Sequence, residues 1–104
     1  AVRLRLPMIV LIFNNQCLAF EYHEQKYRWQ GQVVDEANDF SDADYAGVAN
    51  ALGAVGVRVD TLDAFERAFA GALESERPTV IDIRVDREAF PPVTNFDAAM
   101  QRQI

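Results

Sequence analysis

The stretch Met8-Ile9-Val10-Leu11-Ile12-Phe13-Asn14-Asn15 is the longest apolar run of the 104-residue sequence, and it stops at two adjacent amides. A continuous apolar run of strand length, rich in β-branched residues, is typical of a strand that is buried on both faces, as in a parallel sheet covered by helices. We therefore predict a buried strand over residues 8–13, ended by Asn14 and Asn15.

Helical and strand patterns alternate after this run. The expected elements are a helix from Leu18 to about Trp29, a loop over 31–40, a helix capped by Ser41 and ended at Gly53, a strand over 57–59, a helix capped by Thr61, and a strand over 79–85. Strands that alternate with helices imply a parallel sheet with right-handed crossovers. The predicted fold class is therefore α/β, a parallel sheet with flanking helices.

Burial patterns refine these elements. Each of two helices is expected to bury one stripe, made of Tyr45, Val48, Ala49 and Leu52 in the first and of Leu62, Phe65, Phe69, Ala72 and Leu73 in the second. The strand over 79–85 alternates apolar and polar residues, which predicts a half-covered strand nearer an edge of the sheet. After Pro91 and Pro92 we expect a tail with a short helix over 97–103.

Composition excludes several classes of protein. Ten Lys and Arg against 16 Asp and Glu give a net charge of −6, which argues against nucleic acid as a partner. No apolar run approaches the roughly 20 residues of a membrane span. One cysteine and one histidine exclude an internal disulfide and leave little for a Cys or His metal site. No secretory signal pattern is present, so we expect the cytoplasm, and the start at Ala1 favours a fragment of a longer chain.

The two amides are the first candidate site. In open parallel sheets, ligands bind beyond the carboxyl ends of the strands, and amide and backbone oxygens suit a hard cation such as Mg²⁺. The alternative is that Asn14 and Asn15 form only a turn that closes the strand, and turn propensity alone favours this alternative.

The stretch Ile12-Phe13-Asn14-Asn15-Gln16-Cys17-Leu18-Ala19-Phe20 resembles the end of the thiamine diphosphate motif, in which Asn-Asn ends a strand roughly 25–30 residues after a Gly-Asp-Gly. The resemblance continues through residues 39–46 (DFSDADYA), 49–56 (ANALGAVG) and 77–83 (RPTVIDI). The chain is thus similar to the pyruvate oxidase and acetolactate synthase group of thiamine diphosphate enzymes. The resemblance implies the C-terminal half of a Rossmann-like, cofactor-binding domain, with a tail from about residue 89.

The resemblance also implies a ligand set. Mg²⁺ would take the side-chain oxygen of Asn15 and the backbone carbonyl of Cys17, and the cofactor would lie against Asn15, Cys17, Leu18 and Ala19. A backbone ligand allows a cysteine at this position without a role for its thiol. Because nothing cationic adjoins Cys17 in sequence, we expect that thiol to be unreactive.

Two side chains favour one subgroup of the family. Phe20 and Glu24 lie four residues apart and so share a helix face, and the pair is similar to that of the flavin-dependent pyruvate oxidases. Acetolactate synthases typically carry Met and Trp at the equivalent places. The resemblance implies that Phe20 shapes the pocket and that Glu24 hydrogen-bonds or moves protons around the substrate. The alternative is a core phenylalanine and a solvated glutamate, and His23 between them is expected at the surface.

The function implied is decarboxylation of a 2-oxo acid such as pyruvate, with thiamine diphosphate and Mg²⁺, and with FAD in a full-length homo-oligomer (dimer or tetramer). Residues 1–14 contain no Gly, Asp or Glu, so the Gly-Asp-Gly is expected before Ala1. We therefore predict that the 104 residues alone are inactive and that strand 8–13, lacking a neighbour, pairs with other chains.

Other interpretations remain open. Within the same class, the chain is a fragment of an acetolactate synthase or of another 2-oxo-acid decarboxylase. From a different class, it is a short non-catalytic α/β interaction module or one subunit of a split enzyme. The denatured mass of the native polypeptide separates these two classes.

Overall fold

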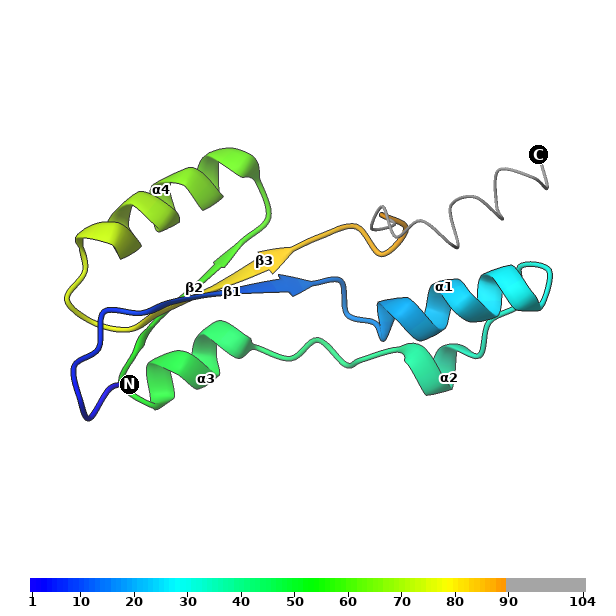
Figure 1. The fold of residues 1–104 in the computed structure, drawn as a ribbon, viewed down its shortest axis with the longest axis horizontal. Helices are drawn as coiled ribbons and strands as arrows, with labels where there is room; N and C mark the ends of the chain where they lie inside the picture. Colours follow the sequence, from blue (N-terminus) through cyan, green and yellow to red (C-terminus); the bar gives the residue numbers. More distant parts are fainter. Residues whose placement is uncertain (90–104) are drawn as a thin grey trace. The chain divides into compact units, whose positions relative to one another are not determined.

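The computed structural model describes residues 1–89, shown in Figure 1. The expected tail from Pro91 and the helix over 97–103 lie outside the described residues. The described chain forms two compact units, one of residues 1–14 and 43–85 and the other of residues 15–42 and 86–89. Within residues 1–89, no helix has the length and apolarity needed to cross a membrane.

The first unit contains a three-stranded parallel sheet of β1 (Ile9–Asn14), β2 (Val55–Val59) and β3 (Thr79–Arg84), in the order β1-β3-β2. Both outer strands start in register with the middle one, since Ile9 and Val55 each pair with Thr79. This sheet, with its helices, confirms the predicted parallel α/β fold.

Two helices of the first unit, α3 (Tyr45–Ala51) and α4 (Leu62–Glu74), lie on opposite faces of the sheet (Figure 1). Helix α3 lies in the crossover from β1 to β2, and α4 lies in the crossover from β2 to β3. Because β3 lies between β1 and β2 in the sheet, the two crossovers run in opposite directions. Right-handed crossovers in opposite directions place their helices on opposite faces. On the α4 face, Ile81, Val59 and Ala72 form the core, with Phe65 and Phe69 packed against it.

The order of the strands corrects two predictions. The strand 79–85, predicted nearer an edge, is the central strand of the sheet. The prediction was wrong because Asp82, a polar residue in the alternating pattern, is buried and not solvated. The strand 8–13, predicted to be buried on both faces, has a neighbour on one side only among the described strands, and Phe13 is 70% exposed. The expected unpaired flank of this strand is therefore present in the described chain.

The start and the buried face of α3 also differ from the prediction. The cap is Asp44, whose Oδ1 accepts a hydrogen bond from the Gly47 amide at 2.8 Å, and not Ser41. Ala46 and Ala49 are buried, whereas Val48 and Leu52 of the predicted stripe are exposed. The cause is a close approach of α3 to β2, since a Cβ on Gly56 would lie 2.0 Å from the Ala46 carbonyl oxygen. Only small residues fit that contact, and they fix the rotation of the helix.

The ends of α3 and α4 agree better with the sequence. Gly53 follows α3 with a φ of +89°, and its amide donates to the Asn50 carbonyl at 3.0 Å, as expected of a helix-ending glycine. The Thr61 hydroxyl oxygen accepts from the Ala64 amide at 3.2 Å, which confirms it as the cap of α4. Leu62 and Leu73, however, are exposed. At 3.6 residues per turn, Leu62 and Leu73 lie at the same edge of the predicted apolar stripe.

The second unit contains α1 (Ala19–Arg28), close to the predicted helix, and α2 (Asp35–Asn38), a single turn inside the predicted loop. Gln25 of α1 holds α2 in place, because its Oε1 accepts from the Asn38 side-chain amide at 2.7 Å and from the Val34 backbone amide at 3.0 Å. Four residues are too few for a hydrophobic period, so this turn had no signal in the sequence.

Candidate functional site

The chain makes a tight turn directly after β1, over residues 15–17. Gln16 adopts a left-handed backbone conformation with a φ of +58°, and the Asn15 Oδ1 atom accepts a hydrogen bond from the Cys17 amide at 3.1 Å. A left-handed conformation costs a residue other than glycine about 1–2 kcal/mol. The 15–17 turn therefore depends on the contacts that hold it.

Backbone pairing with the segment after α2 holds the turn on both sides. The Leu18 amide donates to the Asn38 carbonyl, and the Phe40 amide donates to the Gln16 carbonyl, each at 2.8 Å. Cys17 thereby faces Asp39 in an isolated antiparallel bridge. The turn is thus fixed by residues about twenty positions further along the chain.

Cys17 is only 6% exposed, and its thiol and its carbonyl differ in their suitability as metal ligands. Burial raises the pKa of the Cys17 thiol above its ordinary value of 9.0, which is the behaviour of an inert structural cysteine. The Cys17 carbonyl accepts no hydrogen bond from any described residue. A buried carbonyl normally has a partner, so this oxygen is suited to a ligand that the described residues do not supply.

The donor set of the turn fits a hard cation. The Asn15 amide oxygen and the Cys17 carbonyl are neutral oxygens from one turn, the type of ligand that Mg²⁺ takes together with carboxylate and phosphate oxygens. Within residues 1–89, no group of three His, Cys, Asp or Glu side chains is placed to hold a metal.

The segment that follows β3 packs on α1 in the second unit. The Tyr22 hydroxyl donates to Glu88 Oε1 at 2.6 Å, and Lys26 forms an ion pair with the same carboxylate. Hydrogen bonds from Lys26 and then Tyr22 lower the pKa of Glu88 below its ordinary value. His23, predicted at the surface, is buried with its Nε2 atom 3.1 Å from the Arg87 carbonyl oxygen. The prediction failed because the covering segment lies 64 residues away in sequence.

Arg87 links this segment to the 15–17 turn. Its Nη2 atom donates to Asp39 Oδ1 at 2.6 Å and to the Gln16 carbonyl at 3.3 Å. Its guanidinium carbon lies 5.5 Å from the centre of the Tyr22 ring, within the range of a cation–π contact. Arg87 was not among the predicted site residues, because no local motif connects it to Gln16, which lies 71 residues earlier.

The remaining predicted site residues lie on or just before α1. Leu18 and Phe20 are exposed, Phe20 at 56%. Glu24 forms an ion pair with Arg28 at 2.7 Å and lines a shallow pocket with Trp29. The roles of Phe20 and Glu24 toward a substrate stay predictions.

Asn14 differs from Asn15 in its surroundings, although the two are adjacent. In the first unit, the Asn14 Nδ2 atom donates to Asp82 Oδ1 at 3.0 Å, and Arg58 Nε donates to Asp82 Oδ2 at 2.9 Å. Asn14 thus joins a buried network across the three strands. Of the two amides, the first belongs to the sheet and the second to the turn.

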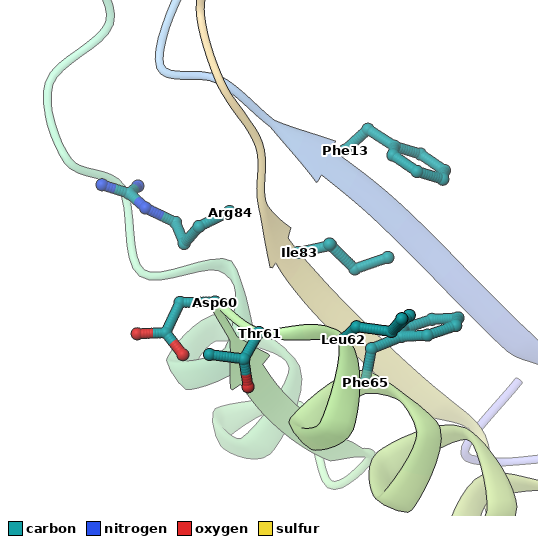
Figure 2. Close-up of a pocket in the computed structure, with 7 residues that line it drawn as sticks. All are labelled: Phe13, Asp60, Thr61, Leu62, Phe65, Ile83 and Arg84. Atoms are coloured by element: carbon teal, nitrogen blue, oxygen red, sulfur yellow. The ribbon is translucent and has the colours of Figure 1, made fainter.

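The first unit also has an apolar groove at the carboxyl ends of its strands, shown in Figure 2. Phe13 and Ile83 from the sheet and Leu62 and Phe65 from α4 line it, with Asp60 and Arg84 at its rim. The helical pattern gives no sign of this groove, because it predicts Leu62 in the buried stripe of α4.

Comparison with known proteins decides the family. Residues 1–83 match the family described as "Thiamine pyrophosphate enzyme, C-terminal TPP binding domain". The chain belongs to this family. Thiamine pyrophosphate is thiamine diphosphate, so the predicted family is confirmed.

The curated proteins to which the chain is similar carry different names. The chain is 33% identical over 93 residues to the putative thiamine pyrophosphate-containing protein YdaP of Bacillus subtilis, covering 89% of this chain and 15% of the relative. It is 32% identical to the acetolactate synthase large subunit of Parasynechococcus marenigrum, covering 79% and 13%. It is 30% identical to a sulfoacetaldehyde acetyltransferase of Castellaniella defragrans, covering 88% and 16%. The chain therefore spans less than a fifth of the length of these relatives.

Proposed function

We propose that the chain is part of a longer thiamine diphosphate- and Mg²⁺-dependent enzyme that decarboxylates a 2-oxo acid, most like a flavin-dependent pyruvate oxidase. In this proposal residues 1–104 are the C-terminal part of the cofactor-binding domain, with the tail from about residue 89. The complete enzyme is a cytoplasmic homo-oligomer that acts on pyruvate and carries FAD. The observation that carries the proposal is the 15–17 turn, where two neutral oxygens suited to Mg²⁺ occur in a chain of this family.

In the proposed site, Asn15 and Cys17 hold Mg²⁺ through the amide oxygen and the backbone carbonyl. Leu18 and Ala19 follow the turn and lie against the cofactor. The bound cofactor supplies the electron sink that decarboxylation of a 2-oxo acid requires. The contribution of this chain is to place two metal ligands and to fix the turn that carries them.

Phe20 and Glu24 are the proposed substrate-side residues. Phe20 lies on the first turn of α1 and is 56% exposed, a position from which its ring can line a pocket. Glu24 lies one turn later, and its ion pair with Arg28 holds the carboxylate on that side of the helix. We assign to Phe20 the shaping of the pocket and to Glu24 a hydrogen bond or proton transfer at the substrate.

The test measures the release of CO₂ from pyruvate by the native protein, with thiamine diphosphate and Mg²⁺ present. We expect Glu24→Gln to lower kcat about 100-fold, as is common for a general acid or base. Glu66→Gln, at an exposed position of α4 in the first unit, is the matched control and should leave kcat unchanged. Equal losses in the two variants would reject the role of Glu24. A protein that binds the cofactor but decarboxylates no 2-oxo acid would reject the substrate class.

Acetolactate synthase is the second candidate, favoured by the names of two relatives, from Parasynechococcus marenigrum and Bacillus subtilis. Product analysis separates the two reactions. A pyruvate oxidase reduces an electron acceptor as CO₂ is released, whereas an acetolactate synthase joins two pyruvate units and needs no acceptor. Condensation of pyruvate without an acceptor would overturn the oxidase assignment.

The alternative of a short interaction module or split-enzyme subunit concerns the size of the native polypeptide. We expect a denatured mass of about 60 kDa, which corresponds to several domains of this size. A native polypeptide with the mass of these 104 residues would reject the proposal of a longer chain.

A further inference from the structure

The carbonyl of Gln16 is one of the points at which other segments hold the 15–17 turn. It accepts two hydrogen bonds, from the Phe40 amide at 2.8 Å and from Arg87 Nη2 at 3.3 Å. Gln16 lies between the two residues that carry the candidate metal ligands, and its backbone is left-handed. A strained backbone persists only where its surroundings fix it. The donors to the Gln16 carbonyl therefore determine whether the turn keeps its shape.

Of these donors, Arg87 is a side chain and is itself held from several directions. Asp39 accepts from its Nη2 atom at 2.6 Å, and the Tyr22 ring lies 5.5 Å from its guanidinium carbon. His23 contacts its backbone carbonyl oxygen at 3.1 Å. The next residue, Glu88, is bound by the Tyr22 hydroxyl and by Lys26. The guanidinium is thus fixed between the Gln16 carbonyl and the carboxylate of Asp39, which faces Cys17 across the bridge.

We propose that Arg87 is a positioning residue for the candidate metal ligands in the 15–17 turn. By binding the Gln16 carbonyl and Asp39 at once, Arg87 ties the turn to the segment that pairs with it. The spacing between the Asn15 amide oxygen and the Cys17 carbonyl is then set before any ligand arrives. The inference rests on the proposed function of this turn. It assigns to Arg87 no contact with metal, cofactor or substrate.

The test compares Arg87→Met and Arg87→Lys in the native protein. Binding of Mn²⁺, used in place of Mg²⁺, is measured by electron paramagnetic resonance with thiamine diphosphate present. Loss of a residue that orients metal ligands typically weakens metal binding about 10- to 100-fold, and we expect a loss in this range for Arg87→Met. Arg87→Lys keeps the charge and one donor and should recover part of the affinity.

Arg77→Met is the matched control. Arg77 likewise donates from Nη2 to backbone carbonyls, those of Gly53 at 2.8 Å and Ala54 at 3.4 Å, but within the first unit. A general loss of stability from removing an arginine would appear in both variants. Of Arg87→Met and Arg77→Met, only Arg87→Met should change the dissociation constant for Mn²⁺.

Asp39→Asn is the second variant, used also if Arg87→Met does not fold. It removes the charge that holds the guanidinium, and it should weaken Mn²⁺ binding less than Arg87→Met. Wild-type affinity in Asp39→Asn, or in Arg87→Met relative to Arg77→Met, would overturn the positioning role alone. A wild-type protein that binds no Mn²⁺ with the cofactor would overturn the proposed function, and the inference with it.

Discussion

Asp82 and Arg58 form an ion pair in which the acid is fully buried. Arg58 Nε lies 2.9 Å from Asp82 Oδ2, and the two residues are register partners on β2 and β3. The other carboxylate oxygen accepts from Asn14 of β1 at 3.0 Å. One carboxylate of the central strand thus joins all three strands, at the end of the sheet where the candidate turn begins.

Removing the arginine of this network should destabilise the first unit. Arg58→Met leaves a buried carboxylate without its cation, and breaking a buried ion pair in this way costs about 3–5 kcal/mol. We expect amide hydrogen exchange in β3 to accelerate by a factor between about 100 and a few thousand, since exchange of core strands reports the free energy of opening.

Arg67→Met is the control for this change, because Arg67 is exposed on α4. Its effect should stay within about 0.5 kcal/mol, as for most surface substitutions. Equal exchange rates in the two variants would show that the Arg58–Asp82 pair does not stabilise the sheet.

The cap of α3 gives a second prediction. Asp44→Ala removes the acceptor for the Gly47 amide and should cost about 1 kcal/mol of unfolding free energy, the usual cost of a lost N-cap. Ser41→Ala, at the cap predicted from the sequence, should change nothing. Local hydrogen exchange of residues 45–51 measures both. A larger effect from Ser41 than from Asp44 would mean that the helix begins earlier.

Local patterns predicted most of the elements but not their relation to one another. The apolar run over 8–13 and the Thr61 cap are local signals, and both marked real elements. The central place of β3 was not predicted, because an aspartate in an alternating pattern normally indicates a solvated face. The partners that allow Asp82 to be buried, Arg58 and Asn14, lie on other strands.

The candidate site shows the same division. The 15–17 turn was located because its motif is contiguous in the sequence. The contacts that support the turn were not predicted. The hydrogen bond of Arg87 to Gln16 and the contact that buries His23 each join residues more than sixty positions apart. Likewise, the buried face of α3 depends on the close approach at Gly56, which helical periodicity does not show.

A third prediction separates the Cys17 carbonyl from its thiol. Because burial raises the pKa of that thiol, it is neutral at pH 7 and is a poor metal ligand. Cys17→Ser keeps the backbone carbonyl and should bind thiamine diphosphate with Mg²⁺ at wild-type affinity by isothermal titration calorimetry. Loss of binding in a variant with an unchanged circular dichroism spectrum would assign a role to the sulfur.

A fourth prediction concerns pH. The pKa of Glu88 is lowered from its ordinary value of 4.5 by hydrogen bonds from Lys26 and Tyr22. Its charged form therefore stabilises the fold above pH 4.5, and this contribution is lost as the pH falls through the lowered pKa. Glu88→Gln should lower the melting temperature at pH 7 and have a progressively smaller effect below pH 4.5.

The size of this effect is limited by solvent. Because the Glu88 side chain is 52% exposed, we expect less than about 1 kcal/mol, the range of surface ion pairs. In a Lys26→Met background the effect of Glu88→Gln should shrink, since the main partner is gone. A difference between wild type and Glu88→Gln that grows on acidification would contradict this account.

The most direct test of the 15–17 turn as a metal and cofactor site is Mg²⁺-dependent binding of thiamine diphosphate to the native protein, compared between wild type, Asn15→Ala and Asn50→Ala. Asn50 also hydrogen-bonds backbone groups, those of Gly56, but in the first unit. We predict that wild type and Asn50→Ala bind the cofactor only with Mg²⁺ and that Asn15→Ala loses this binding. Equal Mg²⁺-dependent affinity in Asn15→Ala and wild type would contradict the assignment of the site.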